Sequence, residues 1–384
     1  MTTKKNNISV GYITRRNLRW VLIWPNIGEE VNPGISYYIR IGIFCFTTGI
    51  LYSSVLMHLI LSLRNQWEIS LSEDIAIVIS LSGIYYITFT FIYKRPCLVK
   101  LLEDLSDFEN FGKPPNIEKE ERWLSMLSNA AFMYSVFATA VYTVVKYLRK
   151  PECERINKEK NLNENCGFII SLWIPFNIQH PITYQIVFLY VLLASQLFVK
   201  PALLISSCAF EFTRHIILRI KHLNALIQSC FEVENYNNCK AKLRYCVQYH
   251  ADILNLAEKL DASFSNTMFA HLTMTSIICA SLEKQFIEDD RLCAGLHMLA
   301  WIANLFLPCV AGQLLFNASE SISHAVWVSK WYQTDVRLRK DIQFLLLRSQ
   351  KNLYISAGPF GILSYPLFVS VLKMSYSVLC LLTS

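Results

Sequence analysis

The residues of this chain that could carry catalysis are scattered rather than grouped. The eight histidines form no HExxH pair and the 12 cysteines form no CxxC pair, so the common spacings of metal ligands are missing. The glycines form no GxGxxG, GxxxxGKS, GxxxxGKT or GxSxG motif that could hold a phosphate or present a nucleophilic serine. The sequence therefore predicts no enzyme, no metal site and no cofactor.

Aromatic side chains are the more informative group, with 23 Phe, 19 Tyr and 8 Trp. A subset falls in the expected outer halves of membrane spans, together with one hydroxyl and one imidazole: Ser82, Tyr85, Tyr86, Phe137, Tyr142, Tyr184, Phe188, His297 and Trp301. Such a lining suits a small apolar ligand, because burying apolar surface contributes roughly 25 cal/mol per Å². The alternative is ordinary packing with an aromatic belt at the membrane interface. We predict that this set binds a small hydrophobic molecule.

Two cysteines, Cys153 and Cys166, fall together in one expected extracellular loop between about Leu148 and Ile182. An oxidising compartment favours a disulfide between them, and two free thiols are the alternative. Most of the other cysteines lie in spans or on the cytosolic side, where a small buried hydrophobic residue is the ordinary role.

The elements that must position these residues are membrane spans. Hydrophobic residues make up 53% of the 384 residues and charged residues only 17%, whereas soluble domains carry roughly a quarter. Seven charge-free windows are long enough to cross a bilayer: 41–63, 75–93, 123–145, 165–199, 262–282, 292–319 and 352–372. The fold class is therefore an all-α membrane protein with seven transmembrane helices, which excludes soluble enzymes, disordered chains and disulfide scaffolds.

Basic residues give the orientation. With the N-terminus in the cytosol, 24 Lys and Arg lie on the cytosolic side and 9 on the opposite side. The positive-inside rule favours this arrangement, so we expect a cytosolic N-terminus and an extracellular C-terminus, the reverse of a G-protein-coupled receptor. The net charge of +7 then faces an anionic leaflet and indicates no nucleic-acid partner.

The charge-free windows and the positions of the basic residues also divide the chain into segments. We expect a cytosolic interfacial segment at 1–34, which carries Trp20 and Trp24, spans one to four at 35–215 with a long outer loop at 148–182, cytosolic helical extensions at 216–262, spans five and six at 263–319, cytosolic anchor helices at 320–351, and the seventh span at 352–384. Apolar residues recur at helical spacing in the extensions, and such faces need partners. We predict that Leu254, Trp327 and Trp331 belong to an anchor between subunits.

Near the C-terminus the residues resemble a known family. The match follows this order: Gly312-Gln313-Leu314, Ser319, Ala325, Trp327 and Trp331, Phe344 through Gln350, Ala357-Gly358-Pro359-Phe360, Leu363-Ser364, Phe368, Val371-Leu372-Lys373, and Ser375-Tyr376-Ser377. These residues resemble the ending of insect odorant receptors in type and spacing. Trp24-Pro25 and Trp173-Ile174-Pro175-Phe176 are also similar, and the middle of the chain matches only in hydropathy.

The resemblance implies an odorant-gated, non-selective cation channel. This chain would be the ligand-binding subunit, binding a volatile odorant and forming a heterotetramer with the shared olfactory co-receptor in the lipid of a sensory dendrite's plasma membrane. The seventh span would line the pore. Ser375, Leu379 and Leu382 fall at i, i+4 and i+7, so they share a helix face, and a leucine ring could close by dewetting. The alternative is that these leucines face lipid.

Rival functions remain in view. A related gustatory-type channel would carry a TY-five-hydrophobic-QF signature in the last span, but Ser375 through Leu382 lack the QF. A G-protein-coupled receptor is opposed by the charge bias, and a transporter by the lack of visible internal repeats. The co-receptor itself has a longer second cytosolic loop.

Overall fold

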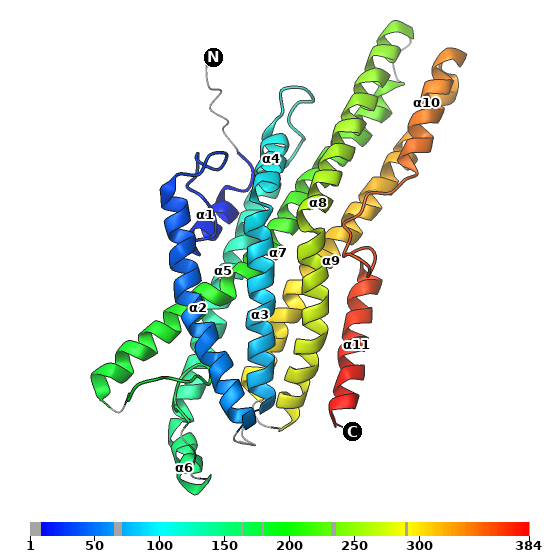
Figure 1. Cartoon of the computed structure of the whole chain (residues 1–384). Helices are drawn as coiled ribbons and strands as arrows, with labels where there is room; N and C mark the ends of the chain where they lie inside the picture. Colours follow the sequence, from blue (N-terminus) through cyan, green and yellow to red (C-terminus); the bar gives the residue numbers. More distant parts are fainter. Residues whose placement is uncertain are drawn as a thin grey trace.

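The computed structural model is a bundle of long helices (Figure 1), and it describes residues 9–64, 71–160, 162, 164–178, 180–231, 236–288 and 291–383. The helices are α1 Tyr12–Trp20, α2 Ile35–Arg64, α3 Leu71–Tyr93, α4 Arg95–Ser106, α5 Ile117–Leu148, α6 Lys150–Lys160, α7 Pro181–Cys230, α8 Tyr236–Glu288, α9 Arg291–Val328, the short 3-10 helix η1 Trp331–Gln333, α10 Val336–Ser349 and α11 Tyr365–Thr383. All seven predicted windows overlap one of these helices.

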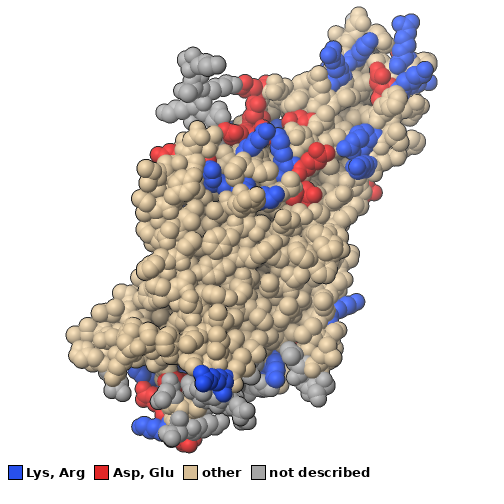
Figure 2. Space-filling view, in the orientation of Figure 1, with Lys and Arg blue, Asp and Glu red and all other residues tan. Residues whose placement is uncertain are grey.

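Five helices in the described residues are long and apolar enough to cross a membrane: Ile35–Arg64, Glu73–Tyr93, Ile117–Leu148, Pro181–Cys230 and Arg291–Gln333. The window 262–282 lies inside α8, whose other half is charged, and α11 contributes the shorter apolar stretch Tyr365–Leu381. Figure 2 shows the result at the surface: one broad band almost free of charged side chains separates two ends where they gather. We call these the α6 end and the α10 end, after the helices that mark them in Figure 1.

α7 and α8 extend well beyond that band. α7 has 50 residues, which at 1.5 Å each makes a rod of roughly 75 Å, more than twice a bilayer's hydrocarbon thickness. In its extension, Ile216, Ile220, Leu223 and Ile227 recur at helical spacing and are buried against neighbouring helices. The extension thus buries an apolar face within this chain.

In the N-terminal segment, Trp24 is buried and packs against Phe91 at 5.8 Å between ring centroids, whereas Trp20 is exposed. One predicted boundary is wrong. The seventh window begins before its helix: residues 352–364 are irregular, with an antiparallel bridge between Ser356 and Ile362, and α11 starts only at Tyr365. Gly358 and Gly361 have positive φ, which breaks the helix there.

Candidate ligand-binding site

An apolar cluster fills the bundle toward the α6 end, and we call it the aromatic cluster. It is formed by residues of α2, α3, α7, α8 and α9 and of the loop after α6. Five residues of the predicted set belong to it or pack against it: Tyr85, Tyr142, Tyr184, Phe188 and Trp301. The structure therefore brings together residues that lie more than 200 positions apart in the sequence.

Tyr85 of α3 is half-buried and packs against this cluster. Its ring meets Phe198 of α7 edge to face at 4.7 Å and Tyr52 of α2 at 5.4 Å between centroids. Its hydroxyl donates to Thr48 Oγ1 at 2.9 Å. Edge-to-face packing is the favourable geometry for aromatic pairs, so α2, α3 and α7 are held together through one tyrosine.

Polar groups of the set are linked by hydrogen bonds rather than left unpaired. The Oη of Tyr52 and the Oγ of Ser82 lie 2.9 Å apart. Trp301 Nε1 donates to His297 Nε2 at 3.2 Å, and Ser80 Oγ lies 3.3 Å from the same nitrogen. Buried polar groups that already have partners can exchange them for a ligand's hydroxyl or carbonyl at little cost.

A buried ion pair fixes the neighbouring ends of α3 and α5. The Glu73 carboxylate lies 2.6 Å from Lys146 Nζ, and the Tyr142 hydroxyl donates to Glu73 Oε1 at 3.2 Å. Because both charged side chains are largely buried, this contact is screened little by water. It orients the Tyr142 ring toward the cluster.

Two residues of the predicted set lie outside it. Tyr86 is 48% exposed and Phe137 is 60% exposed, so both side chains point away from the bundle. Tyr86 follows Tyr85 and is turned about 100° from it around the helix. Phe137 lies two residues from both Ser135 and Thr139, which are on the buried face of α5. A two-residue step turns a side chain to roughly the opposite face, so helical periodicity explains the error.

A cavity of about 1220 Å³ opens at the α6 end next to the cluster. It is bounded by the last turns of α5, by α6, by the loop after α6 and by the first turns of α7. Tyr184 and Phe188 line it and also pack against the aromatic cluster. The volume is large enough for a small organic ligand, which could contact the cluster through Tyr184 and Phe188.

A second, smaller cavity of about 520 Å³ lies between α2, the loop and α7. Residues Leu172 through Phe176 form one wall, and this segment is anchored because Trp173 N donates to the carbonyl of Ser54 at 3.1 Å. Its lining is almost entirely apolar, with Tyr190 on the α7 side. The Trp-Ile-Pro-Phe segment therefore forms a wall between the loop and the bundle.

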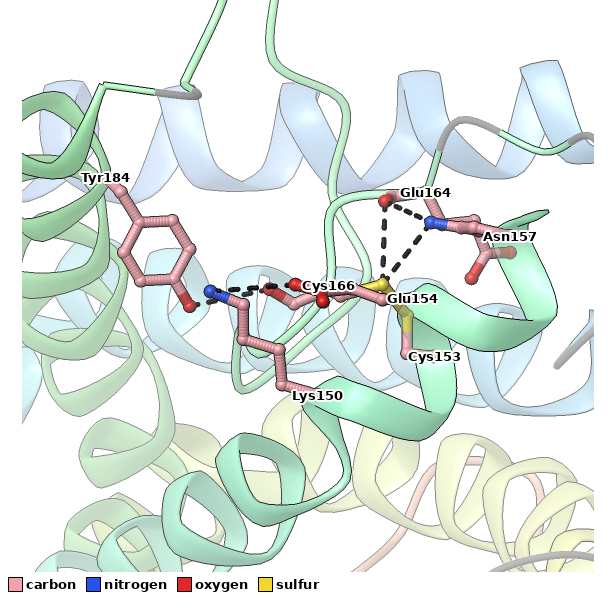
Figure 3. The surroundings of a disulfide bond; sticks show 7 residues. All are labelled: Lys150, Cys153, Glu154, Asn157, Glu164, Cys166 and Tyr184. Atoms are coloured by element: carbon pink, nitrogen blue, oxygen red, sulfur yellow. Dashed lines mark hydrogen bonds and ion pairs between the residues drawn. A yellow bond between two sulfur atoms is a disulfide. The ribbon is translucent and has the colours of Figure 1, made fainter.

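Figure 3 shows the disulfide that holds the loop over the larger cavity. Cys153 of α6 is bonded to Cys166, and Asn157 Nδ2 donates to the carbonyl of Glu164 at 2.9 Å. Lys150 Nζ lies 4.1 Å from the centre of the Tyr184 ring, a cation–π contact that reaches from α6 to α7. Burial raises the pKa of the Glu164 carboxyl. The disulfide and these contacts hold the loop in place beside the larger cavity. The covalent bond also restricts the conformations that the unfolded chain can adopt.

The predicted pore face is wrong at Ser375. This side chain is only 1% exposed, because α11 packs on α8 and Ser375 Oγ donates to Glu283 Oε1 at 3.2 Å. Leu379 is half-buried, and the side chain of Leu382 lies outside the described residues. The exposed side of α11 carries Lys373 and Ser377 instead, with Leu381 beyond them.

Two of the three predicted anchor residues, Trp327 and Trp331, lie side by side. Trp327 at the end of α9 is exposed, and its ring centroid lies 6.4 Å from that of Trp331 in η1, which is half-buried. Leu254 on α8 is half-buried within the chain. Three further apolar side chains, Val336, Phe344 and Leu347 of α10, are exposed at the same end.

Sequence reasoning missed other members of the aromatic cluster, namely Tyr52, Phe168, Tyr190 and Phe198. Tyr190 donates to the carbonyl of Thr47 at 2.7 Å and so joins α7 to α2. Tyr52, Tyr190 and Phe198 lie in apolar spans, where periodicity gives no polar face to distinguish inside from outside. Phe168 comes from an irregular loop, which carries no periodic signal at all.

Comparisons with known proteins agree with the resemblance seen in the sequence. A family model described as "7tm Odorant receptor" matches residues 70–376. Odorant receptor 85c of Drosophila melanogaster is 20% identical over 80% of this chain and 79% of its own length. Odorant receptor 82a of the same species is 24% identical, over 55% of this chain and 56% of that receptor. The match to the latter thus spans little more than half of the relative.

The fold also matches solved structures. The olfactory receptor OR5 from Machilis hrabei gives a TM-score of 0.79 over 96% of both chains at 15% identity, and its structure in complex with eugenol gives 0.77. At this identity the likeness shows the fold alone, and that fold is consistent with the seven spans that the windows predicted. Since the family model covers well over half of the sequence and agrees with a receptor rather than an enzyme, the chain is a member of the odorant receptor family.

Proposed function

We propose that this chain is the odorant-binding subunit of a ligand-gated cation channel, and that the aromatic cluster with its adjoining cavity binds the odorant. The observation that carries the proposal is the position of Tyr184 and Phe188, which line the cavity and pack against the buried cluster. A ligand that buries about 200 Å² of apolar surface there gains roughly 5 kcal/mol. The hydroxyls of Tyr85 and Tyr52 and the His297–Trp301 pair can accept or donate one further hydrogen bond.

The ligand class that fits is a small apolar molecule with one polar group. The related OR5 was solved with eugenol, an odorant of that kind, which supports the same class for this chain. Selection would depend mainly on shape, because one methylene in an apolar pocket changes binding by only about 1 to 3 kcal/mol.

The pocket can be tested with a matched pair of variants. Phe188→Ala removes a ring from the cavity wall and should shift the ratio of half-maximal concentrations between a bulky and a compact odorant by about tenfold. Phe137→Ala removes the same side chain from the exposed face of α5 and should leave the ranking unchanged. Current would be recorded over a panel of volatiles in cells that also express the co-receptor. Equal rescaling of all responses by Phe188→Ala would contradict the pocket assignment.

For the orientation, we propose that the α6 end is extracellular and the α10 end cytosolic. The distribution of basic residues supports this, and Figure 2 shows several Lys and Arg gathered toward the α10 end. An epitope tag after Ser384 should stain intact cells, whereas a tag before Met1 should stain only permeabilised cells. The reverse pattern would refute the channel topology.

For the pore, we propose the exposed side of α11, which carries Lys373, Ser377 and Leu381, in place of the buried Ser375. A ring of leucines can close a pore by dewetting, so Leu381→Ser should raise the basal current without changing odorant ranking. Ser375→Ala is the control, because its side chain faces α8 and should alter neither property. Wild-type basal current and ion selectivity in Leu381→Ser would mean that this side of α11 faces lipid.

The partner would be the co-receptor in a heterotetramer. At the α10 end, Trp327, Phe344 and Leu347 present exposed apolar side chains to water. Apolar surface in water gains from association, whereas span faces in lipid gain little. We therefore place the intersubunit anchor on α10 and the end of α9, with Leu254 contributing mainly to packing within the chain.

A further inference from the structure

Three side chains with metal-binding atoms meet where α5 and α7 cross the N-terminal segment. They are Glu121 of α5 and Glu211 and His215 of α7, and one ligand atom from each lies within 4.8 Å of the others. Glu211 and His215 are each only 2% exposed. They are four residues apart, so they project from the same side of the helix.

Two atoms of this group are buried without a hydrogen-bond partner, namely Glu211 Oε2 and His215 Nε2. The imidazole nitrogen lies 3.1 Å from Glu121 Oε1, close enough for an ion pair when His215 is protonated. That oxygen also accepts from the backbone N–H of Gly11 at 3.2 Å. Because one ligand atom of each side chain lies within 4.8 Å of the others, a single ion could contact all three.

Two arginines near this group, Arg15 and Arg214, are paired with other carboxylates. Arg15 Nη1 lies 2.6 Å from Glu30 Oε1, and Arg214 is paired with Glu120 at 2.5 Å. A buried carboxylate with one oxygen left unbonded costs free energy unless a positive group lies beside it. A bound cation would reduce that cost.

We propose that Glu121, Glu211 and His215 bind one divalent transition-metal ion of the zinc type. One imidazole nitrogen and two carboxylate oxygens form a common donor set for such ions, and three protein ligands leave a position for water. The ion would balance two carboxylates and link the start of α1 to α5 and α7. Gly11 suits the start of α1 because its φ is +70°, a backbone conformation that other residues rarely adopt.

The site was not predicted because its ligands are split between distant segments. Glu211 and His215 alone give one carboxylate and one histidine, a pair too common to indicate a metal. Glu121 lies 90 residues earlier, and only the packing of α5 on α7 brings it near.

The test is metal binding to the purified full-length receptor in complex with its co-receptor, after treatment with a chelator. Zn²⁺ titration should show one tight site in the wild type. Glu211→Gln and His215→Gln should each weaken that site by about tenfold or more, the effect expected when a ligand is lost. Glu120→Gln is the matched control, because it changes the neighbouring carboxylate of α5, which is paired with Arg214, and should keep wild-type affinity.

Melting temperature provides a second measurement. Glu211→Gln keeps the side-chain shape and removes a buried charge, so in chelator it should melt at or above the wild type. Added Zn²⁺ should raise the melting temperature of the wild type and of Glu120→Gln, but not of Glu211→Gln. A wild type that does not respond to Zn²⁺, or a Glu211→Gln variant that binds it as tightly, would overturn the proposal. Neither result depends on odorant responses.

Discussion

Replacing Arg219 by methionine should remove most of the folded receptor. This guanidinium is 2% exposed, and its Nη2 donates to the carbonyls of Asp104 and Leu105 at 3.1 Å and of Asp107 at 2.8 Å. Two of these carbonyls belong to the last turn of α4, where helical hydrogen bonding runs out. Arg219 thus caps α4 with a positive charge at the negative end of the helix dipole.

The expected loss is about 3 to 5 kcal/mol, because methionine removes the donor to the Leu105 and Asp107 carbonyls, and each unpaired carbonyl costs roughly 1 to 3 kcal/mol. The measurement is the melting temperature and the monodisperse fraction of tagged, detergent-solubilised receptor on size exclusion. Lys113→Met is the control, since Lys113 pairs with Glu118 where both side chains are exposed, and its loss should change the stability little. Equal losses of stability in the two variants would show that the contact of Arg219 with α4 stabilises the receptor no more than an ordinary exposed ion pair does.

A methyl group at Gly312 should be nearly as damaging. A Cβ at this position of α9 would lie 2.4 Å from the carbonyl oxygen of Leu363 and 2.7 Å from its Cβ. Leu363 cannot retreat easily, because it is fully buried and its N–H donates to the carbonyl of Ile355 at 2.9 Å. We expect Gly312→Ala to force α9 away from the segment before α11, at a cost of about 3 kcal/mol.

Because that segment leads into α11, the same substitution should reduce odorant-evoked current more than surface expression alone explains. Gly42→Ala is the control: it also places a methyl group in a span, but nothing lies within 4 Å of the new atom. Helix propensity should then leave that variant as stable as the wild type or slightly more stable. Wild-type melting temperature and current in Gly312→Ala would show that α9 and the segment before α11 tolerate separation.

Much of the architecture follows from the sequence alone. Seven windows without charge require helices, because in lipid each backbone N–H and C=O must be satisfied within the segment. The windows 41–63 and 123–145 lie inside α2 and α5, and the family model matches from residue 70 to residue 376. Hydrophobicity was sufficient to predict the fold class, and the order of the C-terminal residues was sufficient to predict the family.

The rotation of each helix about its axis was decided only by tertiary packing. Hydropathy distinguishes core from surface when the surroundings are water, but around a span both the interior and the lipid are apolar. Tyr85 and Tyr86 are therefore equivalent in sequence, and one lies in the aromatic cluster while the other points outward. For the same reason, hydropathy did not reveal that Ser375 is buried. α11 packs on α8 through the face that carries this residue.

Long-range juxtaposition is the other feature that the sequence did not reveal. Arg219 meets the end of α4 more than 100 residues earlier, and Glu121 meets His215 from another helix. No local periodicity links such positions, because their approach depends on how whole helices cross. The sequence by itself determined the class and family, a seven-helix odorant receptor. The packing of its helices decided which side chains form the aromatic cluster, the Arg219 cap on α4, and the group of Glu121, Glu211 and His215.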